Sequence, residues 1–316
     1  MCRFTIILNN KCLPLQEIKG ILWFMEHSIF KQCYKEPYTP DEDFNTRNHQ
    51  INLDGFGIGY FPYDVHKDND TDVTHVDTNT NTNTNINTNT NTNTNTTFHH
   101  HSHPTIYRNI FPSWNDCNLM QILPCIKTQC MMVHIRAVAP IVNSSKFAKN
   151  LQAPVHTYNC HPFEHDGFIF CHNGLMESFY EGNLRKMVVN RISDDLLLKI
   201  KGTTDSEYIF FLLLTLIREN NDIHLSINYL IEFINALSSI NVCSLNIALA
   251  TENNVWVTRY INNDEIPPSL YISTECFDSV VVSSEPLKKD GCEWKLVDKN
   301  QLIHIEKNKT VTYYDI

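Results

Sequence analysis

Cys2, the second residue of the chain, can supply both a nucleophile and a base. Its side chain is small, so we expect an aminopeptidase to remove Met1 and leave Cys2 as the first residue. A terminal cysteine carries a thiol and an α-amine whose ordinary pKa is about 7.7–8.0. That amine can accept the proton of its own thiol. The alternative is an incidental cysteine at the start of an edge strand, and the other motifs must decide between the two.

Asn173 and Gly174 could stabilise the negative charge that such a nucleophile creates. They follow His172 after the apolar run 167–171, which predicts a strand. An asparagine amide and a glycine backbone N–H at the end of a strand can both donate hydrogen bonds to an oxyanion. Taken alone, Asn-Gly after a strand is also typical of a turn.

Two charged residues are candidates for binding charged groups of a substrate. Arg136 ends another predicted strand, where its planar guanidinium could bind a carboxylate through two hydrogen bonds. The alternative is a solvated or salt-bridged arginine. Asp205 falls in the first turn of a predicted helix, where it could bind an ammonium group or only interact favourably with the helix dipole.

Strands outnumber helices in the pattern that must position these residues. Short runs rich in apolar or β-branched residues predict strands over 2–8, 57–61, 131–138, 167–171, 244–251, 255–260, 280–283 and 294–297. Helices are predicted over 18–33, 205–218 and 225–237. The second helix opens on Thr204-Asp205-Ser206-Glu207, which fits a capping box. Asn253-Asn254 predicts a hairpin, so we expect an α+β fold of mostly antiparallel sheets rather than a doubly wound sheet.

One segment is of low complexity. Asparagine and threonine alternate over 78–96 with one interruption, after an acidic lead-in and before a group of histidines. Such a tract has almost nothing to bury and cannot offset the entropy of ordering its backbone. We expect a disordered insertion at about 66–104 within one domain over 2–316. Metal binding by its histidines is not expected, because a mobile tract lacks groups that would orient the ligands.

Composition excludes some classes of protein. The 316 residues would fit two ordinary domains or one large one, and 42% hydrophobic residues suffice for a sizeable core. The formal net charge of −10 leaves no basic surface for nucleic acid. No apolar run approaches the roughly 20 residues that span a membrane. We recognise no signal peptide at the amino terminus, so we expect a cytoplasmic location and 11 reduced cysteines.

A zinc site is the competing interpretation of Cys160-His161 and Cys171-His172. Adjacent residues of a strand face opposite ways, so only one member of each pair could point inward. Two ligands do not close a tetrahedral site. We therefore expect no metal and no other cofactor.

Taken together and in order, the motifs resemble a class II glutamine amidotransferase domain of the N-terminal-nucleophile hydrolase superfamily. Within that class they are most similar to the amidotransferase-like subunit of the fungal glutathione-degrading complex. The resemblance runs from Cys2 to about Leu302. The motifs are Cys2-Arg3-Phe4, Asn52-Leu53-Asp54-Gly55-Phe56-Gly57-Ile58-Gly59-Tyr60, Phe111-Pro112-Ser113-Trp114-Asn115-Asp116, His134-Ile135-Arg136-Ala137, Asn159-Cys160-His161-Pro162-Phe163, His172-Asn173-Gly174, Thr204-Asp205-Ser206-Glu207 and Ser284-Glu285-Pro286-Leu287.

The resemblance implies a four-layer αββα sandwich and a role for each matched residue. Cys2 would be the nucleophile, with its freed amine as the base. Asn173 and Gly174 would form the oxyanion hole. The remaining matched site residues would bind substrate: Arg136 its α-carboxylate, Asp205 its α-ammonium, and His161 in a supporting role.

The activity implied is cleavage of the γ-glutamyl amide of glutathione or a related compound through a Cys2 thioester, with a separate metallopeptidase subunit as partner. One alternative is a glutaminase subunit that passes ammonia from glutamine to a partner synthase. Another is a catalytically silent regulatory relative, although the site residues are intact. The chain departs from the family after Arg136, where Ala137-Val138-Ala139-Pro140 lacks a hydroxyl partner for the substrate carboxylate, and in an insertion at about 143–152.

Overall fold

The structure is a computed structural model of the chain, and it describes residues 2–35, 38–40, 52–63, 103–138, 153–180, 183–237, 242–288 and 291–316. The low-complexity insertion at about 66–104 falls almost entirely outside these residues, as do Ala139, Pro140 and the insertion at about 143–152. The expectations about these segments therefore stay predictions.

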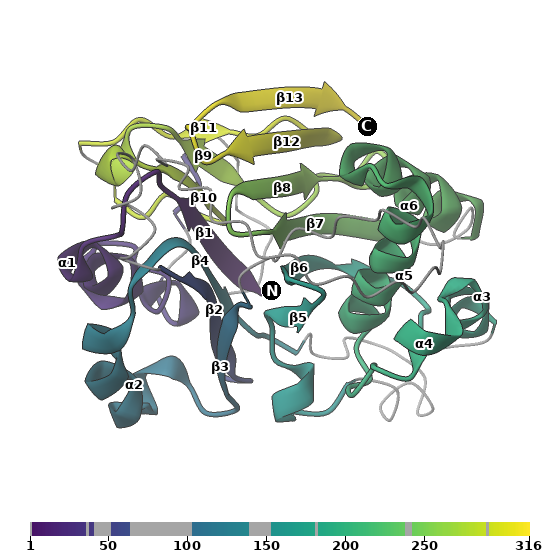
Figure 1. Cartoon of the computed structure of the whole chain (residues 1–316), viewed down its shortest axis with the longest axis horizontal. Helices are drawn as coiled ribbons and strands as arrows, with labels where there is room; N and C mark the ends of the chain where they lie inside the picture. Colours follow the sequence, from purple (N-terminus) through teal and green to yellow (C-terminus); the bar gives the residue numbers. More distant parts are fainter. Residues whose placement is uncertain are drawn as a thin grey trace, which may run out of the picture.

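Two sheets form the centre of the molecule, and every strand pairing that the structure describes is antiparallel (Figure 1). The first sheet has the order β11-β9-β10-β1-β4-β2-β3. Its strands are β1 Arg3–Leu8, β2 Phe56–Pro62, β3 Thr105–Asn109, β4 Thr128–Ile135, β9 Tyr271–Ser273, β10 Val280–Ser283 and β11 Lys295–Leu296.

The second sheet has the order β13-β12-β8-β7-β6-β5. Its strands are β5 Phe163–His165, β6 Phe168–Met176, β7 Cys243–Ala250, β8 Asn254–Arg259, β12 Gln301–Glu306 and β13 Val311–Asp315. β7 and β8 pair directly across the turn, as the hairpin prediction requires.

Helices cover the outer face of each sheet (Figure 1). Beside the first sheet lie α1 Leu15–Lys19 and α2 Cys117–Ile122. Beside the second lie α3 Leu184–Arg191, α4 Asp194–Leu197, α5 Asp205–Asn220 and α6 Ile223–Leu237. The layers are therefore helix, sheet, sheet, helix, and the predicted α+β, αββα fold is confirmed.

Strand periodicity explains how one chain fills three apolar layers. Successive side chains of a strand point to opposite faces of its sheet. In β1, Ile6 packs between the two sheets, whereas Ile7 packs under the helices of the first sheet. In β6, Cys171 lies between the sheets and Phe170 faces α5 and α6. Both sheets are thus buried on two faces.

β1 lies inside its sheet, between β10 and β4, and not at an edge. Its first residues are also held by the segment that follows β10. The Phe4 N–H donates to Ser284 Oγ at 3.0 Å, and the Ser284 N–H donates to the Phe4 carbonyl at 2.9 Å. The incidental edge-strand interpretation of Cys2 therefore does not describe this environment.

The helix predicted over 18–33 was wrong in its extent. α1 ends at Lys19, five residues of π-helix follow over Gly20–Phe24, and a 3₁₀ turn occupies Lys31–Cys33. Between them the chain folds back, because the Ile29 N–H donates to the Ile21 carbonyl and the His27 N–H to the Leu287 carbonyl. Tertiary hydrogen bonds thus replace those of a continuous helix.

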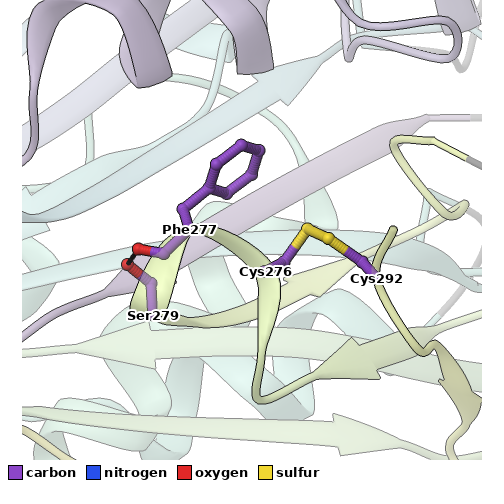
Figure 2. Close-up of a disulfide and its surroundings, with 4 residues drawn as sticks. All are labelled: Cys276, Phe277, Ser279 and Cys292. Carbon is purple, nitrogen blue, oxygen red and sulfur yellow. Dashed lines mark hydrogen bonds between the residues drawn. A yellow bond between two sulfur atoms is a disulfide. The ribbon is translucent and has the colours of Figure 1, made fainter. Parts of the chain in front are cut away.

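The expectation that all 11 cysteines are reduced was also wrong. Cys276 and Cys292 form a disulfide with a Cα–Cα distance of 5.3 Å (Figure 2). It joins the turn before β10 to the segment that follows that strand, where Ser284 lies. The turn is tight, since Phe277 has a φ of 62° and its carbonyl accepts a hydrogen bond from Ser279 Oγ. The other nine cysteines, all within the described part of the chain, are free.

Candidate active site

Cys2 lies directly before β1 and against the end of β4. Arg3 is opposite Ile135 in the register of these two strands, so Cys2 reaches the residues that follow β4. The Ala137 N–H lies 3.3 Å from Cys2 Sγ, and the thiol lies 3.5 Å from the Ala137 carbonyl. The thiol is only partly buried, so a substrate could reach it.

Arg136 directly precedes Ala137, whose backbone contacts this thiol, and is 5% exposed. Its N–H donates to the Gly55 carbonyl and its Nη2 to the Ala153 carbonyl, both at 2.8 Å. Nη1 is buried and has no hydrogen-bond partner among the described residues. A buried cationic nitrogen without a partner is costly, and a bound carboxylate would satisfy it.

Asp54 and Gly55 hold the segment after β4 in place. Asp54 Oδ2 accepts a hydrogen bond from the Val138 N–H at 2.7 Å. Gly55 has a φ of +107°, and a Cβ there would lie 2.7 Å from both the Asn109 carbonyl oxygen and Cys160 Sγ. Only glycine fits this backbone, so Gly55 allows the chain to pack closely against Asn109 and Cys160.

Asn173 and Gly174 lie within β6 and not in a turn after it. The strand continues to Met176 because β7 pairs with it over this whole stretch. Asn173 is 1% exposed, and its Oδ1 has no partner in the described part of the chain. A Cβ at Gly174 would lie 2.0 Å from the Ser244 carbonyl oxygen, so the position accepts no side chain.

Asp205 is the first residue of α5 and joins that helix to β6. Its Oδ2 accepts a hydrogen bond from the Met176 N–H at 3.0 Å, and its Oδ1 accepts one from the Ser206 N–H at 2.8 Å. The capping box is half formed. Thr204 accepts from the Glu207 N–H, but the Glu207 carboxylate accepts from the backbone N–H groups of residues 201 and 202 instead.

Tyr180 forms a hydrogen bond with Asp205 and also interacts electrostatically with Arg136. The Tyr180 hydroxyl accepts a hydrogen bond from the Asp205 N–H at 3.2 Å. Burial raises the pKa of Tyr180; the Asp205 carboxylate raises it further, and the Arg136 guanidinium lowers it. The acid and the arginine are therefore both within electrostatic range of one neutral hydroxyl.

His161 is a buried, neutral ring beside the site. Its ring centroid lies 4.2 Å from that of His134 and 4.6 Å from that of Phe163. Burial holds the pKa of His161 well below its ordinary value, and it lowers the pKa of His134 to about 3. Both ring nitrogens of His161 are buried without a partner among the described residues.

His134 bridges the two sheets at this end of the molecule. Its Nε2 donates to the His172 carbonyl at 3.3 Å, and so connects β4 to β6. Arg136 follows His134 by two residues and Asn173 follows His172 by one. The six residues singled out from the sequence thus form two groups joined by this bridge, with Cys2 and Arg136 in one and Asn173, Gly174 and Asp205 in the other. His161 packs on the bridge itself.

Sequence reasoning overlooked several side chains that hold these groups together. They are Arg3 and Glu285 behind Cys2, Tyr180 beside Asp205, and His172 and Ser206 between β6 and α5. All of these except Tyr180 stand inside motifs already recognised, and that position was the only available signal for them.

The structure offers no support for the zinc interpretation. Within the described ranges, no three His, Cys, Asp or Glu side chains are grouped so that they could hold a metal ion. Cys160 lies near the carbonyls of Asn109 and His156, and burial raises the pKa of its thiol. Separately, none of the helices described is both long and apolar enough to cross a membrane.

The layers and the strand order place the chain in a known structural class. It is similar to a glutamine aminotransferase class-II domain protein from Silicibacter pomeroyi, with a TM-score of 0.58 and 18% identity over 100% of this chain and 99% of that one. It is also similar to glutamine phosphoribosylpyrophosphate amidotransferase from B. subtilis, with a TM-score of 0.54 and 14% identity over 100% of this chain and 49% of that one. The chain has the fold of class II glutamine amidotransferase domains.

A sequence relative agrees with this fold. The chain is 24% identical over 347 residues to the probable glutamine amidotransferase DUG3 of Saccharomyces cerevisiae, covering 97% of this chain and 82% of that protein. No family model matches the chain. The resemblance predicted from the motifs is thus confirmed by both kinds of comparison.

Proposed function

We propose that the chain hydrolyses the γ-glutamyl amide bond of glutathione or a related γ-glutamyl compound through a thioester on Cys2. The observation that carries the proposal is the position of the thiol. Cys2 Sγ lies 3.3 Å from the Ala137 nitrogen, one residue from an arginine with a buried, unpartnered Nη1. These two observations support a nucleophile on Cys2 and a carboxylate-binding role for Arg136.

The first half-reaction forms the thioester. After Met1 is removed, the Cys2 α-amine takes the thiol proton and Sγ attacks the γ-carbonyl carbon. The carbonyl oxygen becomes an oxyanion that accepts hydrogen bonds from the Asn173 amide and the Gly174 N–H. When the C–N bond breaks, the α-ammonium returns its proton to the departing amine, which is Cys-Gly for glutathione and ammonia for glutamine.

The second half-reaction releases glutamate. The free α-amine takes a proton from water, and the resulting hydroxide adds to the thioester carbonyl through the same oxyanion hole. The C–S bond then breaks and the thiolate is reprotonated. During both steps, Arg136 would hold the α-carboxylate and Asp205 the α-ammonium, while His161 would support the pocket as a neutral ring.

The preference for glutathione rests on the motif resemblance to the fungal glutathione-degrading complex, which also supports a separate metallopeptidase partner. The cytoplasmic location stays a prediction from the sequence. Glutamine carries the same α-carboxylate and α-ammonium as glutathione, so Arg136 and Asp205 could bind either substrate. The names of the yeast relative and of the B. subtilis enzyme both refer to glutamine and to an amidotransferase, which favours a glutaminase subunit as the second candidate.

Substrate competition tests the proposal. Purified chain, with loss of Met1 verified by intact mass, is assayed for glutamate release from glutathione and from glutamine, alone and with cell extract that supplies partners. We expect faster release from glutathione, and no release by Cys2→Ala. Release from glutamine alone would favour the second candidate. A chain that retains Met1 and releases nothing would support a catalytically silent relative.

A further inference from the structure

His172 forms hydrogen bonds on both sides of its ring, although it is 2% exposed. Its Nε2 lies 3.0 Å from the Ser244 carbonyl oxygen on β7, and its Nδ1 lies 2.9 Å from Ser206 Oγ on α5. A carbonyl oxygen only accepts, so Nε2 carries the hydrogen. The other ring nitrogen, Nδ1, pairs with the Ser206 hydroxyl.

One end of this connection touches the predicted oxyanion hole. A Cβ added to Gly174 would lie 2.4 Å from His172 Nε2 and 2.0 Å from the Ser244 carbonyl oxygen. The imidazole and its hydrogen-bond acceptor thus occupy the space beside the Gly174 backbone. The ring therefore packs directly against the strand backbone at Gly174.

The other end touches the predicted ammonium-binding acid. Asp205 Oδ1 accepts a hydrogen bond from the Ser206 N–H at 2.8 Å and lies 3.2 Å from Ser206 Oγ. Ser206 is 5% exposed, so water competes little for these bonds. The chain of contacts from Ser244 through His172 and Ser206 to Asp205 hence connects the oxyanion hole to the acid.

We propose that His172 and Ser206 are positioning residues that set the spacing between the oxyanion hole and Asp205, and thereby select γ-glutamyl over β-aspartyl substrates. This inference rests on the proposed function. In a γ-glutamyl group two methylenes separate the α-carbon, which bears the ammonium, from the scissile carbonyl; in a β-aspartyl group there is one. A fixed spacing accommodates one of these lengths and not the other.

The test compares glutathione with its β-aspartyl analogue, β-aspartyl-Cys-Gly, which differs by one methylene and has the same leaving group. Discrimination is the ratio of the two kcat/KM values. We expect Ser206→Ala to lower this ratio about tenfold or more, since one methylene is worth roughly 10- to 200-fold in discrimination. Ser206→Thr keeps the hydroxyl and should restore most of the ratio.

Two further variants separate positioning from stability. His172→Gln can still donate to the Ser244 carbonyl but cannot reach Ser206 as Nδ1 does, so it should lower the ratio like Ser206→Ala, and it serves if that variant fails to fold. Ser226→Ala is the matched control. Ser226 lies in α6, is fully buried and donates to the carbonyl of Asp222, the residue before that helix, so its loss should leave the ratio unchanged.

The outcomes distinguish the two claims. Wild-type cleavage of glutathione with a ratio that stays the same in folded Ser206→Ala and His172→Gln would overturn the positioning role alone. A ratio that falls equally in Ser226→Ala would do the same, because the effect would then be structural. A wild-type chain that cleaves neither glutathione nor glutamine would overturn the proposed function, and the inference with it.

Discussion

Arg3 and Glu285 form a buried ion pair directly behind Cys2, with Arg3 Nε 2.7 Å from Glu285 Oε1. Arg3 Nη1 also donates to the Cys2 carbonyl at 3.0 Å, and Glu285 Oε2 accepts from the Tyr38 N–H at 2.9 Å. The side chains of Arg3 and Glu285 are 10% and 1% exposed. The pair therefore holds the peptide bond between Cys2 and Arg3 against the segment that follows β10.

Arg3→Ala should destabilise the fold by about 3–5 kcal/mol, because it leaves the Glu285 carboxylate buried without its partner. The measurement is the free energy of unfolding in urea. Arg191→Ala is the matched control: Arg191 pairs with Glu219 at the surface, with side chains 38% and 45% exposed, and such a pair contributes about 0–1 kcal/mol. Equal losses in the two variants would show that the Arg3 pair has no special structural role.

Cys2→Ala and Cys2→Ser should keep the fold and lose γ-glutamyl cleavage. The thiol is partly exposed at the start of β1, so its removal leaves little empty space in the core. Thermal unfolding and glutamate release measure the two effects. A variant in which Met1 cannot be removed should be equally inactive, because the base is then part of a peptide bond. Wild-type turnover by Cys2→Ala would exclude the thioester mechanism.

Arg136→Ala and Asp205→Ala should each lower kcat/KM for glutathione and for glutamine, because one substrate charge would be left unpaired. The expected loss of transition-state binding free energy is about 2–5 kcal/mol. Arg136→Lys should restore little, since lysine lacks the planar fork. As a control, iodoacetamide should still label Cys2 in all three variants, because nucleophile and base are untouched. If Asp205→Ala kept full activity, Asp205 would serve only to join α5 to the Met176 N–H.

Local sequence signals predicted strands better than helix extents and long-range contacts. β10 has the predicted bounds Val280–Ser283, and the other predicted strands were located to within a few residues. Five strands were missed, namely β3, β5, β9, β12 and β13. β12, for example, is defined by its long-range pairing with β8 on one side and with β13 on the other. Asn173-Gly174 was compatible with a turn until its pairing partner β7 was known.

The sequence singled out individual candidate residues but not the connections between them. Arg136 was recognised because it ends a strand within a motif, whereas its unpartnered Nη1 is a property of the folded pocket. The His172–Ser206 hydrogen bond joins residues 34 apart in the sequence, and the Cys276–Cys292 disulfide depends on a short Cα–Cα distance. Such contacts are set by packing and leave no local pattern.

Deleting residues 77–103 should change neither the melting temperature by more than a few degrees nor the activity. In the paired strands β2 and β3, Tyr60 lies opposite Thr105, so the two chain ends that this tract connects are already held side by side. Loop-closure entropy varies slowly, by roughly 0.6 kcal/mol per doubling of length. Differential scanning calorimetry and glutamate release check both parts. A large loss of melting temperature would mean that the tract packs against the fold.

Stability should fall as the pH drops from about 6.5 toward about 3. Burial lowers the pKa of His134 to about 3 and keeps that of His161 well below its ordinary value, whereas both rings titrate near 6.5 in the unfolded chain. Between these values the unfolded state binds protons that the folded state excludes, so the free energy of unfolding decreases as pH falls. Above about pH 6.5 neither state is protonated and these rings contribute no pH dependence.

Each buried ring can contribute a slope of up to about 1.4 kcal/mol per pH unit within that window. Urea unfolding of the wild-type chain at several pH values between 7.5 and 4.5 measures the total slope. His134→Gln removes one titrating group but keeps an N–H that can donate to the His172 carbonyl, as His134 Nε2 does at 3.3 Å. The slope of this variant should therefore be smaller than the wild-type slope by up to that amount. An unchanged slope would mean that His134 binds its proton equally well in both states, and the buried, neutral ring beside His161 would be the wrong description of this part of the site.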